Sequence, residues 1–351
     1  MSLKIPGFAE NEVEYYSRQM VMKDFGVEGQ RRLKRAKVCV VGLGGLGSPV
    51  SIQLASMGVG HLRLVDRDVV DISNLHRQHL YGVNVIGYPK VEAAAERLNK
   101  LNPYITVEPM PLSVTPSNAE DLIKGMDLVV DCLDSMAPRY SLNRACIRLG
   151  IPLIHGAVIT QIGNATTIIP GETVCLECFQ GGLDDEALPS CAIVGVHPSI
   201  ISIVASIQVS EAVKLLLGKT PSLRNTLLFC DLSDLSFERI TLARMENCPV
   251  CGSQPRSQPS PIVHEPFQEI CGREGRRVFV FEPDGGVNID LKALYRSLEG
   301  QGFNVDVKAK LGTSFSRGPM KGSILVSGVM ILEGFKSSDD AVRLHDTLIK
   351  S

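Results

Sequence analysis

Three glycines, Gly42, Gly44 and Gly47, follow an apolar run with the spacing Gly-x-Gly-x-x-Gly. A turn of this kind between a strand and a helix directs backbone N–H groups and a helix N-terminus at phosphate. Asp66 ends the next apolar run, where a carboxylate accepts hydrogen bonds from ribose hydroxyls. These residues alone indicate a nucleotide site, and a redox dinucleotide is the more common ligand of the pattern.

The charged and amide side chains in segment 66–90 favour a triphosphate instead. They are Asp66, Asp68, Asn74, Arg77, Gln78 and Lys90. The pyrophosphate of a dinucleotide is already met by the helix dipole, whereas attack on the α-phosphate of ATP needs cations along the phosphates. Arg77 and Lys90 can supply them. A solvated charged loop is the alternative for any single residue, but it explains the ordered set less well.

Four cysteines form two Cys-x-x-Cys pairs, Cys175 with Cys178 and Cys248 with Cys251. Four thiolates at this spacing suit a tetrahedral zinc ion. Because the protein supplies all four ligands, no position remains for substrate, and we expect a structural zinc site. A dithiol redox site is the rival interpretation, which the pairing of the two motifs disfavours.

Alternating strands and helices predict an α/β, Rossmann-like fold with a mostly parallel sheet that positions these residues. Amphipathic residues at 12–33 predict one or two helices ahead of it. The expected strands lie at 37–44, 61–68, 105–112 and 127–134, and the expected helices at 48–58, 89–103 and 117–125. An antiparallel extension of the sheet is expected at 151–158, 161–171 and 227–242, interrupted by a long helix at 198–218.

A change of composition after Cys251 indicates a domain boundary. Residues 253–264, directly after Gly252, are rich in Ser, Pro and Gln, as is typical of a linker. We therefore predict a domain at 1–252, a linker at 253–264 and a small α+β domain at 265–351. The expected element order of the small domain is strand, helix, strand, strand, helix.

The bulk composition narrows the choice of partners and location. A chain of 351 residues with a formal net charge of −2 carries no excess charge that favours nucleic acid or an anionic membrane. No N-terminal signal segment and no run of about 18 apolar residues is visible, so a cytoplasmic location is expected.

A series of motifs resembles the ubiquitin-activating enzyme superfamily. In chain order the motifs are Tyr16-Ser17-Arg18-Gln19, Gly42 to Gly47, Asp66 with Asp68, Ser73 to Gln78, Pro89-Lys90 and Asp131 to Asp134. The likeness runs from about residue 15 to 252 and is greatest to prokaryotic members that adenylate sulfur-carrier proteins for molybdopterin or thiamine synthesis. It implies a homodimer in which the C-terminal glycine carboxylate of a ubiquitin-like protein attacks the α-phosphate of ATP. The products are an acyl-adenylate and pyrophosphate.

The same resemblance implies roles for individual residues. Asp66 would hold the ribose, and the phosphate contacts would come from Gly45, Asn74, Arg77 and Lys90. Asp134 would bind Mg²⁺, and Arg18 would reach the triphosphate from the neighbouring subunit. Ser135 stands where the family usually has asparagine, and its hydroxyl would contact ATP or water. The remaining implied cofactor-binding positions are Gly42, Gly44, Asp68, Ser73 and Gln78.

Cys191 is the candidate nucleophile. In relatives the cysteine of this loop can form a thioester, acyl disulfide or persulfide with the activated carrier, and a thiolate attacks an acyl-adenylate better than water does. Beyond this step, one branch delivers sulfur and the other passes the carrier to a conjugating enzyme. The C-terminal domain resembles in its placement the ubiquitin-fold domain that recruits such a partner, which favours the conjugation branch.

Two other functions remain as alternatives. An NAD-dependent oxidoreductase would explain the glycine turn and Asp66, but it leaves Arg77, Lys90 and Asp134 without a task. The other hypothesis is a zinc-stabilised scaffold without enzymatic activity, and only Ser135 supports it.

Overall fold

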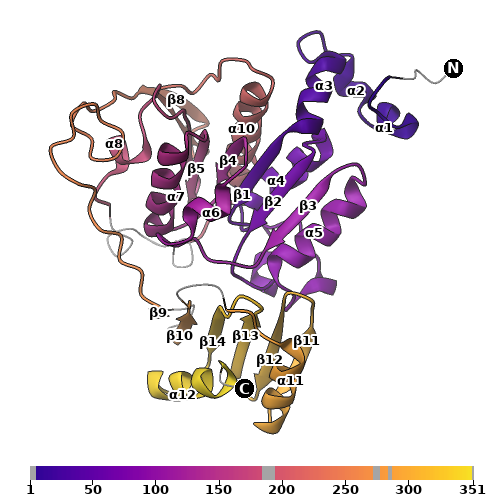
Figure 1. Cartoon of the computed structure of the whole chain (residues 1–351), viewed down its shortest axis with the longest axis vertical. Coiled ribbons are helices and arrows are strands. Elements are labelled where there is room, and N and C mark those ends of the chain that lie inside the picture. Colours follow the sequence, from indigo (N-terminus) through magenta and orange to yellow (C-terminus); the bar gives the residue numbers. More distant parts are fainter. Residues whose placement is uncertain (1–4, 184–193, 272–276, 284–286, 350–351) are drawn as a thin grey trace.

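The protein folds around two β-sheets (Figure 1), and the computed structural model describes residues 5–183, 194–271, 277–283 and 287–349. The larger sheet has the strand order β3-β2-β1-β4-β5-β6-β7-β8. The first five strands in this order, β3, β2, β1, β4 and β5, are parallel to one another, whereas β6, β7 and β8 each pair antiparallel with the strand before them. The bounds are β1 (Lys37–Val41), β2 (His61–Val65), β3 (Thr106–Met110), β4 (Leu128–Asp131), β5 (Leu153–Ile159), β6 (Ile162–Ile168), β7 (Thr226–Asp231) and β8 (Ser236–Thr241). The predicted Rossmann-like sheet with an antiparallel extension is confirmed.

The carboxyl ends of the central parallel strands meet at one edge of this sheet. Val41 at the end of β1 pairs with Val65 of β2 on one side and with Asp131 of β4 on the other. Residues that follow these three strands therefore lie along the same edge, where ligands of open α/β sheets bind.

Helices cover both faces of the larger sheet. Their bounds are α1 (Glu10–Tyr15), α2 (Ser17–Met20), α3 (Gly26–Arg35), α4 (Gly47–Met57), α5 (Lys90–Leu101), α6 (Ala119–Ile123), α7 (Met136–Leu149), α8 (Leu176–Gln180) and α10 (Pro198–Leu216), with 3-10 turns η1 (Ile72–Asn74) and η2 (Val83–Val85). Helices α4, α5 and α10 share one buried apolar cluster, and α6 and α7 share another. By length and composition α10 would be able to span a membrane, but it packs against α4, β5 and β6. The N-terminal segment forms three short helices, where one or two were expected.

The C-terminal part forms a second sheet that is antiparallel throughout, in the order β11-β12-β13-β14-β10-β9. Its elements are β9 (Phe267–Cys271), β10 (Arg277–Phe281), α11 (Leu291–Gly300), β11 (Asn304–Lys308), β12 (Gly312–Arg317), β13 (Met320–Leu325), β14 (Met330–Glu333) and α12 (Ser338–Ile349). Both helices share an apolar cluster with this sheet, including Phe279 and Phe315.

The structure corrects the expected element order of this part. Segment 322–335, expected as one strand, contains β13 and β14, because Gly328 adopts φ +85° in a turn between them. Apolar residues on both sides of that turn conceal it in the sequence. Strands β9 and β12 were not expected at all.

Candidate functional site

At both ends of the glycine turn that follows β1, the space is too small for any residue but glycine. Gly42 adopts φ +87°, and a Cβ there would lie 2.7 Å from the backbone oxygen of Cys132. A Cβ on Gly47 would lie 1.8 Å from the backbone oxygen of Gly42, so the turn closes directly onto the start of α4. The nearest atom to a Cβ on Gly44 is the side-chain nitrogen of Gln78 at 3.8 Å, and on Gly45 it is Ile201 Cδ1 of α10 at 2.9 Å.

Asp66, directly after β2, is tied to this turn by its side chain. Its Oδ2 accepts a hydrogen bond of 2.6 Å from the backbone N–H of Leu43, and its Oδ1 accepts one of 2.8 Å from the N–H of Asp68. Burial raises the pKa of Asp66. Each oxygen keeps a second lone pair, so the carboxylate can both hold the turn and accept a hydroxyl hydrogen bond.

Lys90 and Asp68 form a buried ion pair beside Asp66. Lys90 begins α5 with only 5% of its surface exposed, and its Nζ lies 2.7 Å from Oδ2 of Asp68. Burial opposes the charge of Lys90, but Asp68 and then Asp66 outweigh that cost and raise its pKa. A short β-bridge between Val69 and Pro89 sets this geometry. The ammonium group is therefore fixed and charged at the edge of the sheet.

Segment 73–78 forms a compact turn at the same edge. Asp71 caps the 3-10 turn η1 by accepting a 2.8 Å hydrogen bond from the N–H of Ser73, and Asn74 Oδ1 accepts one of 3.1 Å from the N–H of Asp71. Arg77 donates to the backbone oxygen of Ser73 at 2.7 Å. Gln78 is buried, and its Oε1 has no hydrogen-bond partner among the described residues. A buried acceptor of this kind is rare and suggests a missing donor.

Asp134 and Ser135 follow β4. Asp134 is exposed, and its negative charge acts on Lys90 and on Arg67, which places it near both cations. Ser135 occupies the N-cap position of α7 without a capping hydrogen bond from its side chain. The structure thus brings Asp134 to the side of Lys90 and leaves the Ser135 hydroxyl available.

Buried charged groups support this edge from inside the domain. The sequence places Asp131 and Arg139 among the family motifs and His155 near the site, but it does not reveal their mutual contacts. Asp131 Oδ2 lies 2.7 Å from Nδ1 of fully buried His155 and 3.4 Å from Nε of Arg139. Burial opposes the ionisation of Asp131, but Arg139 and His155 outweigh it and lower its pKa. Arg67, between Asp66 and Asp68, was also overlooked, although its position between two site carboxylates was visible in the sequence.

Of the predicted site residues that the structure describes, Arg18 is not brought to this edge by its own chain. Arg18 is exposed on α2. The neighbouring Gln19 donates to the backbone oxygen of Met57, at the end of α4 opposite the glycine turn. An 11-residue helix is about 16 Å long, so Arg18 does not reach the turn of its own chain. Cys191 lies outside the described residues.

The four cysteines of the two Cys-x-x-Cys pairs come together in one cluster. All four sulfurs lie within 4.8 Å of one another, with 3.7 Å between Cys175 and Cys248 and 3.4 Å between Cys178 and Cys251. None of them forms a disulfide. A tetrahedral zinc ion separates its sulfur ligands by about 3.8 Å, so the cluster fits zinc.

The cysteine cluster is linked through α7 to the sheet edge that carries Asp66, Lys90 and Asp134, which is predicted to bind a nucleotide and is called the nucleotide edge below. Asn143 Oδ1 accepts a 3.1 Å hydrogen bond from the N–H of Leu176, and Arg144 pairs with Glu177 at 2.8 Å. These contacts fix α8, which carries Cys178, against the helix that begins after Ser135.

Comparison with known proteins agrees with this geometry. Residues 16–250 match the ThiF family. The SAMP-activating enzyme E1 of Haloferax volcanii is 43% identical over 242 residues, which are 69% of this chain and 89% of that enzyme. The sulfur carrier protein adenylyltransferase of Thermus thermophilus is 41% identical over 271 residues, 76% of this chain and 98% of that protein. A crystal structure of E. coli MccB with MccA-N7isoASN has a TM-score of 0.59 at 25% identity, over 64% of this chain and 70% of that chain.

These relatives favour adenylyl transfer over the alternative of an NAD-dependent oxidoreductase. Their names describe activating enzymes and adenylyltransferases, and they cover the part of the chain that holds Asp66, Lys90 and Asp134. The predicted resemblance to the ubiquitin-activating superfamily is confirmed, and the chain belongs to the ThiF family.

Proposed function

We propose that this chain uses ATP to adenylate the C-terminal glycine of a ubiquitin-like or sulfur-carrier protein. The observation that carries the proposal is the fixed ammonium of Lys90, held by Asp68 beside Asp66 at the edge that follows the glycine turn. In the reaction a glycine carboxylate oxygen bonds to the α-phosphorus of ATP. The bond from that phosphorus to the bridging oxygen breaks, and pyrophosphate leaves.

Each site residue has a task in this reaction. Asp66 accepts from the ribose, and the N–H groups of Gly44 and Gly45 face phosphate. Gly42, whose own N–H donates to the backbone oxygen of Val65 at 2.8 Å, shapes the turn that presents them. Lys90, Arg77 and Asn74 bind phosphate oxygens, while Asp68 fixes Lys90. The buried acceptor of Gln78 and the hydroxyls of Ser73 and Ser135 complete the polar lining. Charge on the α-phosphate and the departing pyrophosphate is thus met by groups that are already oriented.

Mg²⁺ and a second subunit would complete the site. The exposed carboxylate of Asp134 offers the oxygen ligand that Mg²⁺ prefers, and the ion would neutralise pyrophosphate charge. Arg18 would reach the triphosphate from the other subunit of a homodimer, because it stands at the far end of α4 from its own glycine turn. A structural zinc ion would be held by the four-cysteine cluster.

Cys191 would then take the activated carrier as a thioester. Its sulfur bonds to the carrier's carbonyl carbon, the bond to the AMP oxygen breaks, and the thiol proton passes to solvent. A cytoplasmic location suits an enzyme that uses ATP and keeps reduced thiols.

Isotope exchange between pyrophosphate and ATP tests the adenylation step. We expect exchange only when a carrier protein ending in Gly-Gly is added, and loss of exchange in Asp134→Ala. A chain that shows no exchange with any such carrier and binds a nicotinamide nucleotide would reverse the choice between the two functions.

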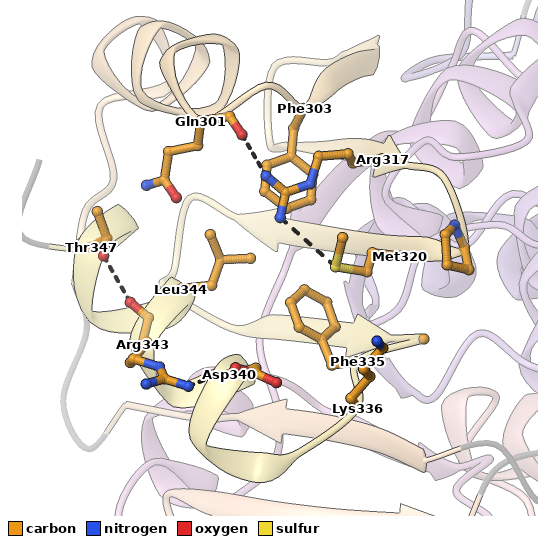
Figure 2. Close-up of a pocket in the computed structure, with 12 residues that line it drawn as sticks. Gln301, Phe303, Arg317, Met320, Phe335, Lys336, Asp340, Arg343, Leu344 and Thr347 are labelled. Carbon is orange, nitrogen blue, oxygen red and sulfur yellow. Dashed lines mark hydrogen bonds and ion pairs between the residues drawn. The ribbon is translucent and has the colours of Figure 1, made fainter.

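The small domain at 265–351 is proposed to recruit the partner that receives the carrier. Support comes from a pocket of 380 Å³ at one end of the second sheet (Figure 2). Its lining includes the apolar side chains of Phe303, Met320, Phe335 and Leu344 and the cations Arg317, Lys336 and Arg343. The guanidinium of Arg317 lies over the ring of Phe303, 4.3 Å from its centroid, and donates to the backbone oxygen of Gln301 at 2.6 Å.

This pocket suits a segment that joins an acidic side chain to an apolar one. One carboxylate of the pocket, Asp340, is paired with Arg343 at 2.6 Å, which leaves two further cations for a ligand. Reversing charge in Lys336→Glu should leave carrier adenylation intact and reduce transfer of the carrier to its acceptor. Unchanged transfer would argue against recruitment through this pocket.

A further inference from the structure

The small domain is docked against the nucleotide edge of the larger domain. Figure 1 shows the second sheet lying next to β3 and α5. The Glu92 carboxylate, in the first turn of α5, accepts hydrogen bonds from the backbone N–H groups of Lys310 at 3.0 Å and Leu311 at 2.7 Å. Ser327 Oγ donates to the backbone oxygen of Pro111 at 2.5 Å. These contacts come from the β11–β12 and β13–β14 turns.

A third contact reaches into the nucleotide site itself. Glu282, directly after β10, forms an ion pair with Arg67, and its Oε1 also accepts a 2.8 Å hydrogen bond from Ser113 Oγ. His264 Nδ1 lies 3.6 Å from Oε2 of Glu282. Only 4% of Glu282 is exposed, so its charge is buried and needs these partners.

The ion pair between Arg67 and Glu282 balances the charges that surround Arg67. Arg67 stands between Asp66 and Asp68 in the chain, and Glu282, Asp68 and Asp134 all act on its guanidinium. Burial opposes that charge, but the three carboxylates outweigh it and raise the pKa of Arg67. Asp68 is the carboxylate that fixes Lys90. Both Arg67 and Lys90 thus act on Asp68, and Glu282 gives Arg67 another partner.

We propose that Glu282 is a positioning residue of the nucleotide site, which keeps Arg67 from Asp68 so that Lys90 remains in place for ATP. The inference rests on the proposed use of ATP. It makes the small domain part of the nucleotide site, in addition to any recruiting role. Without the carboxylate of Glu282, Arg67 binds Asp68 and displaces Lys90.

Calorimetric titration of the full chain with Mg²⁺ and the non-hydrolysable analogue AMPCPP tests the inference, with thermal melting as the check of folding. We expect Glu282→Gln to weaken binding by about tenfold, a size typical of coupled neighbours. The double variant Glu282→Gln/Arg67→Gln should recover most of the loss, because no guanidinium then competes for Asp68. A purely structural role predicts that affinity is lost and regained only together with the melting temperature.

A matched control and a milder variant complete the test. Glu269→Gln, which breaks the exposed pair with Arg277 in the same domain, should bind like the wild type. If Glu282→Gln does not fold, Ser113→Ala removes one support of Glu282 and should weaken binding in the same direction. If Glu282→Gln folds and binds AMPCPP with unchanged affinity, the positioning role alone is overturned. If Glu282→Gln does not fold, unchanged affinity in Ser113→Ala has the same meaning. A wild-type chain that binds no AMPCPP overturns the proposed function and this inference together.

Discussion

Lys90 Nζ lies 2.7 Å from Oδ2 of Asp68, and the backbone N–H of Asp68 donates to Asp66. The Asp68 carboxylate thus positions the Lys90 ammonium, while the Asp66 carboxylate holds the backbone of Asp68. These contacts connect Asp66, the expected ribose ligand, with Lys90, the expected phosphate ligand. A substitution at either residue should therefore alter the position of the other.

Removing the charge of Lys90 tests this arrangement. In Lys90→Gln we expect the rate of carrier-dependent pyrophosphate exchange to fall by about 100-fold, as when one preorganised donor is lost. Lys100→Gln, on the exposed side of the same helix, is the matched control and should exchange at the normal rate. Equal rates in both variants would remove Lys90 from the reaction.

Two glycines of the same turn should respond differently to alanine. Gly47→Ala places a Cβ 1.8 Å from the oxygen of Gly42, so the turn must open, and we expect a loss of about 2 kcal/mol in the free energy of unfolding together with weaker ATP binding. Gly44→Ala meets its nearest atom at 3.8 Å and should unfold like the wild type. Denaturant unfolding curves measure both. Equal unfolding midpoints would contradict the close approach.

The cysteine cluster predicts a bound metal. Elemental analysis should find about one zinc ion per chain, lost in Cys248→Ser and retained in Cys230→Ser, whose thiol is buried away from the cluster. Chelation should lower the melting temperature of the wild type, because metal binding to the folded state adds to its stability. A metal-free chain with an unchanged melting temperature would exclude a structural role.

Acid should destabilise the fold through His155. Burial lowers the pKa of His155, even though Asp131 acts in the opposite direction. As the pH falls through about 6.5, the unfolded chain therefore binds a proton that the folded chain does not. Stability then decreases with falling pH, by at most about 1.4 kcal/mol per pH unit for one such group.

Chemical denaturation between pH 7.5 and 5.5 measures this slope, above the range in which Asp131 titrates. His155→Gln should reduce the slope, whereas His76→Gln, at an exposed position, should leave it unchanged. A slope that is the same in His155→Gln and in the wild type would assign the acid sensitivity to other groups.

Much of the nucleotide edge could be predicted from the sequence because its residues lie at the ends of regular strands. The glycine turn, Asp66 and Lys90 each follow or precede an element with a clear pattern, and parallel strands bring such ends together. The cysteine cluster was predictable from spacing, since two pairs of thiols complete one tetrahedron.

What the sequence did not reveal depends on contacts between distant segments. The sequence predicts one strand where β13 and β14 lie, because only Ser327 and Gly328 separate two apolar runs. The partner of Arg67 could not be found by pattern, because no periodicity relates it to Glu282. The docking of the small domain was likewise hidden, since backbone N–H groups at Lys310 and Leu311 make the contact with Glu92.

The pair of Arg67 and Glu282 also has a consequence for biosynthesis. The two residues are 215 positions apart, so a ribosome adding 5 to 20 residues per second, the general range, makes the arginine roughly 10 to 40 s before the glutamate. During that interval the emerging chain carries the glycine turn, Asp66 and Lys90 with Arg67 still unneutralised by its carboxylate. The nascent protein is thus expected to acquire its full affinity for ATP only after Glu282 has been synthesised.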